Sequence, residues 1–115
     1  ENTESYTAAK GGVAALTHAM AVSLAGRVRV NAIAPGWIDT GAYYREGYVP
    51  GDSPADRRQH PSGRIGVPED IARTALFLCD EENCFINGET ITVDGGMTKL
   101  MVYHNDCGWK YRPEE

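Results

Sequence analysis

The sequence predicts an α/β chain, in the order helix, strand, turn-rich loop, helix, strand and tail. Three observations support this class. A long run of small and helix-favouring residues fills about 3–25. Two apolar segments, 27–33 and 89–93, each end in a turn that contains glycine, as strands do. A second helical pattern, at 68–80, lies between these two segments.

Composition narrows the class of protein. With 115 residues, 42% hydrophobic and 23% charged, the chain is typical of one small soluble globular domain. We find no apolar run long enough to cross a membrane and no signal-peptide pattern. The net charge of −5 argues against a surface for nucleic acid. The arginines are too few and too interspersed with other residues to form a basic surface despite this negative charge. They are Arg27, Arg29, Arg57 and Arg58.

The cysteines indicate a reducing compartment. Cys79, Cys84 and Cys107 are odd in number and include no closely spaced pair. Cys79 falls in an apolar helical run, which predicts a buried, reduced thiol. A cytoplasmic location fits this pattern best.

The first helix is expected at Thr3 to Ala25, ended by Gly26. Gly11 and Gly12 inside it cost about 1 kcal/mol each relative to alanine. Close backbone packing on a surface of small residues would offset that cost. His18 is expected to face solvent or an interface. An apolar stripe at three- and four-residue steps consists of Val13, Leu16, Met20 and Leu24.

The first strand is expected at 27–33, ended by Pro35-Gly36. Ligands bind at such carboxyl ends of strands in open α/β sheets. The loop at 41–67 is long enough to be either a functional lid or disordered, and its aromatic residues favour a lid. We expect a short helix at Ser53–Gln59, capped by Ser53 with proline next. The loop contains three tyrosines, and the sequence does not indicate that any one of them contacts the substrate. They are Tyr43, Tyr44 and Tyr48.

The second helix is expected to begin at Pro68 and end near Asp80, with two acidic residues in its first turn, which suit the helix dipole. After an Asn87-Gly88 turn, Ile91 and Val93 alternate with threonines in the last strand. This strand is expected to end in a tight turn at 94–96. The side of the second helix expected to be buried consists of Ile71, Ala72, Ala75, Leu76, Leu78 and Cys79.

Tyr6 and Lys10 form a candidate catalytic pair. Their spacing of four places both side chains on one helix face. A phenol pKa is about 10, and a neighbouring ammonium lowers it toward the working range of a general acid or base. Such a pair could pass a proton to or from an alcohol or carbonyl oxygen. The alternative is a half-buried aromatic residue beside a solvated helix charge.

Three motifs occur in order: Tyr6-x-x-x-Lys10, Pro35-Gly36-x-Ile38-x-Thr40 and Asp94-Gly95-Gly96. Together they resemble the C-terminal half of a short-chain dehydrogenase/reductase, over about residues 2–96. The resemblance implies the C-terminal part of a Rossmann-type doubly wound parallel sheet. Residues 1–96 would be a portion of a single NAD(P)-binding domain, and 97–115 a C-terminal extension.

The resemblance also implies an activity, which is hydride transfer between NAD or NADP and a small alcohol or carbonyl substrate. Tyr6 would be the general acid or base, assisted by Lys10, and both would contact the cofactor. Pro35, Gly36, Ile38 and Thr40 would bind its nicotinamide side. No metal is implied. The first helix would form a homodimer or homotetramer contact. The family's catalytic Ser and Asn have no counterpart in this chain, and the sequence leaves NAD or NADP and the substrate open.

No glycine-rich phosphate-binding turn follows a strand in this sequence. We therefore expect a piece of a protein about twice as long, inactive without its N-terminal half. The tail departs from the family pattern, and its aromatic residues are expected to cover a sheet edge or a neighbouring subunit. Its His104, Asp106 and Cys107 are interpreted as a chance cluster. The alternatives are a non-catalytic binding or oligomerisation protein with this fold, or a short interaction module.

Overall fold

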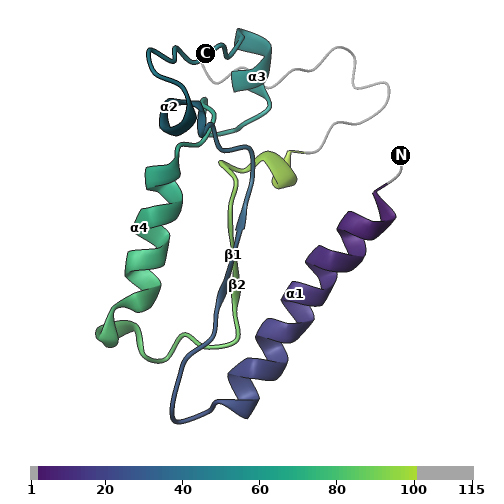
Figure 1. Cartoon of the computed structure of the whole chain (residues 1–115), viewed down its shortest axis with the longest axis vertical. Helices are drawn as coiled ribbons and strands as arrows, with labels where there is room; N and C mark the ends of the chain where they lie inside the picture. The colour runs from purple at the N-terminus through teal and green to yellow at the C-terminus, as the bar shows by residue number, and fades with distance from the viewer. Residues whose placement is uncertain (1–2, 101–115) are drawn as a thin grey trace. The chain divides into compact units, whose positions relative to one another are not determined.

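A computed structural model describes residues 3–100 of the chain (Figure 1). Helices and strands alternate as predicted, which confirms the α/β class. The expectations for the tail beyond residue 100 lie outside the described residues. The elements are α1 (Glu4–Ser23), β1 (Ala32–Pro35), α2 (Gly41–Tyr44), α3 (Pro54–Arg58), α4 (Pro68–Cys79) and β2 (Thr90–Val93), with 3₁₀ turns at Glu81–Asn83 and Met97–Lys99.

The chain forms two compact units, which are described separately. Among residues 3–100, the first contains 3–34 together with Arg73–Ile91, and the second contains Pro35–Ala72 and 92–100. β1 and β2 pair in a two-stranded sheet. The Ala32 amide donates to the Glu89 carbonyl at 2.8 Å, and the Gly36 amide donates to the Val93 carbonyl at 3.0 Å. Equal steps along both strands make the pair parallel.

The last strand agrees with its sequence pattern. Ile91 and Val93 are half-buried, whereas Thr90 and Thr92 are exposed. The turn before the strand is also as predicted, because Gly88 has a φ of 81°, in the left-handed region that favours glycine.

The first strand was predicted too early. It starts at Ala32 and includes Pro35, instead of spanning 27–33. The residues before the strand are held largely by hydrogen bonds that involve side chains. The Val30 amide donates to Asn87 Oδ1 at 2.8 Å, and Asn31 Nδ2 donates to the Ile86 carbonyl at 3.0 Å. These bonds replace a regular ladder.

Arg29 holds the turn that follows α4. Its guanidinium donates to backbone carbonyls of the helix end and of the turn. A planar group with five donors suits this task. The acceptors are Leu78 at 2.7 Å, Asp80 at 3.2 Å, Asn83 at 3.3 Å and Ile86 at 3.2 Å.

The predicted first helix is confirmed, but its buried side is not the predicted one. Thr17 and Ala21 are the buried residues of α1. Asn87 Nδ2 donates to the Ala21 carbonyl at 3.3 Å, and a Cβ on Gly88 would lie 3.4 Å from the Ala21 Cβ. Small side chains are what permit this approach. Of the predicted stripe, Leu24 is half-buried, while Val13, Leu16 and Met20 are exposed by 56%, 56% and 38%.

The close packing expected at the α1 glycines has no partner within residues 3–100, since a Cβ on Gly11 or Gly12 would meet nothing within 4 Å. His18 is exposed, as expected.

Helix α4 begins and ends close to its predicted limits. Its less exposed residues follow the i, i+3, i+4, i+7 pattern of one helix face, with Leu78 buried. Ala72, Leu76 and Cys79 fall on a different face and are exposed. The prediction that these three are buried, including the thiol of Cys79, is therefore wrong. The half-buried residues of the inner face are Ile71, Thr74 and Ala75.

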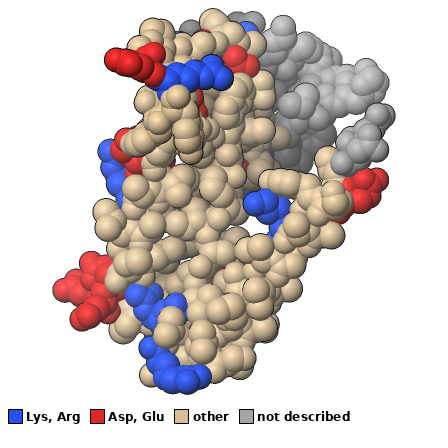
Figure 2. Space-filling model, in the orientation of Figure 1, with Lys and Arg blue, Asp and Glu red and all other residues tan. Residues whose placement is uncertain are grey.

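Within the described part of the chain, no helix has the length and apolar character needed to cross a membrane. Figure 2 shows acidic and basic side chains in small separate groups on one face, without a broad basic area.

We predict that Arg29→Ala lowers the free energy of unfolding of the full-length gene product by about 2–3 kcal/mol, because hydrogen bonds to a charged group contribute strongly. Urea unfolding measures this loss. Arg27→Ala is the matched control, since within residues 3–100 the Arg27 guanidinium donates only to the Ser23 carbonyl, at 3.4 Å. Equal losses for both variants would contradict the role assigned to Arg29.

Candidate active site

The segment Pro35–Thr40 begins at the last residue of β1 and lies in the second unit, and its geometry is set by Gly36. A Cβ on Gly36 would lie 2.6 Å from the Asp94 Cβ and 2.7 Å from the Asp94 Cα. Any other residue would force the two backbones apart. Glycine is therefore needed at this position because the chain after β2 approaches it so closely.

Ile38 pairs with Gly66 in an isolated parallel bridge. The Gly66 amide donates to the Trp37 carbonyl at 3.1 Å, and the Asp39 amide donates to the Gly66 carbonyl at 2.8 Å. In such a bridge the amide and carbonyl of Ile38 itself point to the opposite side. They are therefore not used in the pairing with Gly66. The contact of Ile38 backbone groups with a carboxamide stays a prediction.

Thr40 completes the predicted set in this segment. It precedes α2, yet its side chain does not cap that helix, and the residue is exposed. Pro35 is exposed and Gly36 half-buried. The structure thus brings Pro35, Gly36, Ile38 and Thr40 together in one short segment.

Asp39 orders the start of the loop after this segment. Its Oδ1 accepts from the Gly41 amide at 2.8 Å, and its Oδ2 accepts from the Tyr48 hydroxyl at 2.9 Å. The hydrogen bond to Asp39 is the main cause that raises the pKa of Tyr48. The sequence did not single out this aspartate.

The loop also contacts the start of α4. The Tyr43 hydroxyl donates to Glu69 Oε1 at 2.6 Å, and this bond raises the pKa of Tyr43. Tyr43 and Tyr44 are otherwise exposed on α2, a helix that was not predicted. The loop is therefore folded and anchored, while its predicted role as a lid stays a prediction.

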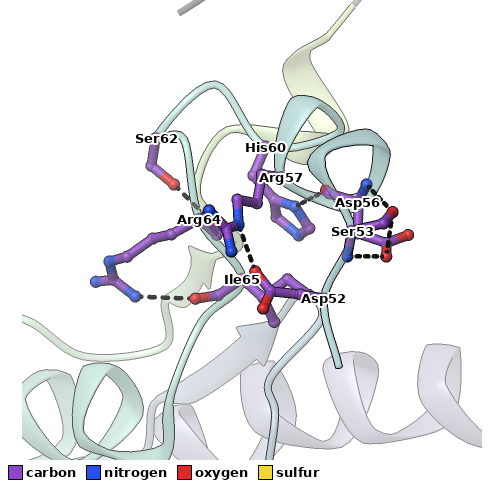
Figure 3. Close-up of polar contacts among 8 residues, drawn as sticks. All are labelled: Asp52, Ser53, Asp56, Arg57, His60, Ser62, Arg64 and Ile65. Carbon is purple, nitrogen blue, oxygen red and sulfur yellow. Dashed lines mark hydrogen bonds and ion pairs between the residues drawn. The ribbon is translucent and has the colours of Figure 1, made fainter. Parts of the chain in front are cut away.

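Helix α3 agrees with the prediction. Ser53 Oγ accepts from the Asp56 amide at 3.2 Å, and the Ser53 amide donates to Asp56 Oδ2 at 2.8 Å, which is a reciprocal capping box (Figure 3). These bonds lower the pKa of Asp56. Arg57 Nε donates to Asp52 Oδ2 at 2.7 Å and lowers the pKa of that carboxyl.

Asp94 folds the turn after β2. Its carboxylate accepts from Thr98 Oγ1 at 2.6 Å, from the Thr98 amide at 2.9 Å and from the Gly96 amide at 2.9 Å. The Thr98 hydroxyl is the main cause that lowers the pKa of Asp94. Gly95 and Gly96 have φ values of 63° and 85°, which agrees with the predicted tight reversal.

Tyr6 and Lys10 lie in the first unit, one turn apart on α1. Lys10 Nζ is 5.4 Å from the centroid of the Tyr6 ring, and the Tyr6 side chain is 65% exposed. The structure thus places the two side chains on one face, as their spacing predicts. They belong to a different unit from the Pro35–Thr40 segment.

Two features near the segment have no clear sequence signal. His60 is buried, although a single histidine between a polar helix and a proline looks like a solvated residue. Arg64 donates to both Asp70 carboxylate oxygens, at 2.7 and 2.8 Å, and an arginine six residues before an aspartate is too common a pattern to predict this. Among residues 3–100, no group of His, Cys, Asp and Glu could hold a metal ion.

Comparison with known proteins defines the family. A family model described as enoyl-(acyl carrier protein) reductase matches residues 1–98. This chain belongs to the short-chain dehydrogenase/reductase family, and its fold is part of a Rossmann-type α/β domain.

Relatives and solved structures agree with this assignment. An uncharacterized oxidoreductase of Thermotoga maritima is 48% identical over 106 residues, which are 89% of this chain and 41% of the relative. The 3beta-hydroxysteroid dehydrogenase 1 of Eggerthella lenta is 42% identical over 94 residues, 81% of this chain and 36% of the relative.

An apo SCOR enzyme from Clostridium thermocellum superimposes with a TM-score of 0.76 at 49% identity, covering 95% of this chain and 40% of that one. The acetoin dehydrogenase YohF of Salmonella typhimurium gives 0.74 at 32% identity, covering 89% and 40%. This chain therefore spans about 40% of the length of such relatives.

We predict that Gly36→Ala destabilises the full-length gene product by about 1–3 kcal/mol, because the added methyl group would overlap Asp94. Thermal unfolding measures the loss. Gly51→Ala is the control, since a Cβ there meets nothing within 4 Å. Equal melting temperatures for Gly36→Ala and wild type would show that the two backbones do not approach as described.

We predict a pH dependence from Asp94. Because folding lowers its pKa, its stabilisation is complete above the ordinary value of 3.8 and is lost as the pH falls through the lower, folded value. The advantage of wild type over Asp94→Asn should shrink from about pH 7 to about pH 3 in urea unfolding. Thr98→Val, which removes the hydroxyl donor, should weaken this dependence. If the difference in unfolding free energy between wild type and Asp94→Asn did not change with pH, the role assigned to Asp94 would be refuted.

Proposed function

We propose that the full-length protein is an NAD- or NADP-dependent oxidoreductase that interconverts a small alcohol and the corresponding carbonyl compound. The Tyr6–Lys10 pair is the observation that carries this proposal. An exposed phenol with an ammonium 5.4 Å from its ring centroid can exchange a proton with a ligand at the surface of α1. The membership of the family supports the same chemistry.

In the direction of oxidation, Tyr6 accepts the hydroxyl proton of the substrate while the carbinol C–H bond breaks and the carbonyl forms. In the direction of reduction, Tyr6 returns a proton to the carbonyl oxygen. The nicotinamide supplies or accepts the hydride when it is bound. Lys10 would favour the phenolate by its positive charge and would be the residue that holds the ribose of the bound cofactor.

The residues of the Pro35–Thr40 segment fit a flat, polar ring. Gly36 lets this segment lie against the turn after β2, the backbone of Ile38 has a donor and an acceptor on the side away from Gly66, and Thr40 offers an exposed hydroxyl. We infer that Pro35, Gly36, Ile38 and Thr40 hold the nicotinamide side of the cofactor. The dehydrogenases named for a hydroxysteroid and for acetoin support an alcohol or carbonyl substrate.

We further infer that residues 1–115 do not catalyse alone and that the working form is a cytoplasmic homodimer or homotetramer, completed by an N-terminal half. The coverage of about 40% of the relatives supports the part of this inference that concerns the N-terminal half. So do the few buried residues within 3–100, which are Thr17, Ala21, His60 and Leu78. Nicotinamide-dependent turnover by a purified 1–115 polypeptide would refute it.

We predict that Tyr6→Phe in the full-length gene product lowers kcat about 10²–10⁴-fold, the usual contribution of a general acid or base. Stopped-time assays that follow reduced nicotinamide measure this, once an alcohol or carbonyl substrate is found by screening. Tyr44→Phe is the control, because Tyr44 is 81% exposed on α2 and has no assigned role.

The alternative is a non-catalytic binding or oligomerisation protein of this family. Turnover of Tyr6→Phe within a few-fold of wild type would remove Tyr6 from the mechanism. Absence of turnover in the wild type, with oligomer assembly intact, would favour the alternative.

A further inference from the structure

His60 is the most buried side chain among residues 3–100, with 1% of its surface exposed. It follows α3, and its backbone is held on both sides. Its amide donates to the Arg57 carbonyl at 3.0 Å, and its carbonyl accepts from the Gly63 amide at 2.7 Å. The imidazole is thus placed by the backbone rather than by chance packing.

The hydrogen bonds of the imidazole define its tautomer. Nδ1 lies 3.0 Å from the Asp56 carbonyl oxygen (Figure 3). A carbonyl can only accept, so Nδ1 carries the proton. In the neutral ring Nε2 is then an acceptor, and it has no hydrogen-bond partner in the described part of the chain.

The ring contacts the segment that we assign to the cofactor. The ring centroids of His60 and Trp37 are 6.0 Å apart and the planes are tilted by 52°, an arrangement typical of interacting aromatic side chains. Trp37 stands between Gly36 and Ile38 in sequence. Its carbonyl is held by Gly66, so its backbone and its indole are both contacted by the stretch 60–66.

The same stretch reaches the turn after β2. The Ser62 amide donates to the Gly95 carbonyl at 3.0 Å, and a Cβ on Gly95 would lie 3.6 Å from the His60 Cβ. His60 therefore lies where the end of α3, the indole of Trp37 and the glycine turn meet. Movement of its ring would be passed to Trp37 and to the peptides on either side of it.

We propose that His60 is a positioning residue, whose Nδ1–H bond to Asp56 fixes the imidazole against Trp37 and so holds Gly36 and Ile38 in the conformation that binds the nicotinamide. This inference deepens the proposed function and rests on it. His60 itself touches neither substrate nor cofactor, because it is buried. The loop that includes α3 would thereby contribute to cofactor affinity.

Stability alone does not explain an imidazole at this position. A buried acceptor without a partner is unfavourable, and phenylalanine would keep the aromatic contact without that acceptor. In a phenylalanine variant the Asp56 carbonyl would still have a hydrogen-bond donor, because it also accepts from the Gln59 amide at 3.2 Å. What phenylalanine would lose is the hydrogen bond that fixes the orientation of the ring.

The test compares His60→Ala and His60→Phe with wild type in the full-length gene product. His18→Ala is the matched control, since His18 is exposed on α1. Two quantities are measured for each protein. One is the ¹H–¹⁵N resonance of the Trp37 indole, assigned by its loss in Trp37→Phe. The other is the Kd for NADH and NADPH by calorimetric titration.

We expect His60→Ala to shift the Trp37 resonance and to raise the Kd about 10-fold or more, since small displacements at a binding site are costly. His60→Phe, which we expect to stay folded, should give a smaller shift and a smaller rise, and His18→Ala none. For both His60 variants, KM for the cofactor should change more than kcat.

A Trp37 resonance and a Kd at wild-type values in either His60 variant would overturn the inference. His60→Phe carries the test if His60→Ala does not fold. A wild-type protein that binds neither NADH nor NADPH would overturn the proposed function and this inference with it. Wild-type binding with unchanged variants would overturn the inference alone.

Discussion

The parallel pairing of β1 with β2, and the backbone contact with which it ends, constrain everything else in the second unit. The Gly36 amide donates to the Val93 carbonyl. Asp94, which follows Val93, lies so close to Gly36 that a side chain at position 36 would have no room. The carboxylate of Asp94 then folds the turn after β2. The stretch 60–66 joins that turn to the residues after Gly36. The groups that we infer to face the cofactor are held by this contact, because several backbone segments share it.

The elements that the sequence predicted well have local causes. The apolar spacing, the Ser53 cap with proline beside it, and the glycines of tight turns each act within a few residues. The start of β1 was mispredicted because Val30 and Asn31 bond to the distant loop at 86–89, which no local pattern encodes. The exposure of the α1 stripe and of Cys79 likewise depends on which elements are present to cover each helix face.

The residues of the candidate site likewise fall into those that local sequence predicts and those that it does not. Tyr6, Lys10 and the Pro35–Thr40 segment could be named from motif and family, because spacing along one helix or one turn determines their chemistry. His60 could not, because its importance arises from burial against Trp37, a residue 23 positions earlier in the sequence. The residues that we propose to react or to bind the cofactor could therefore be named from the sequence, while the residue that we infer to position them could be identified only from the three-dimensional arrangement.

The claim on which this account depends is that the protein binds a nicotinamide dinucleotide. Calorimetric titration of the full-length gene product with NAD and with NADP tests it most directly. The account predicts saturable binding of at least one of them, at one site per chain. If neither binds to the folded protein, the assignment of Tyr6, Lys10 and the Pro35–Thr40 segment to an oxidoreductase site is contradicted.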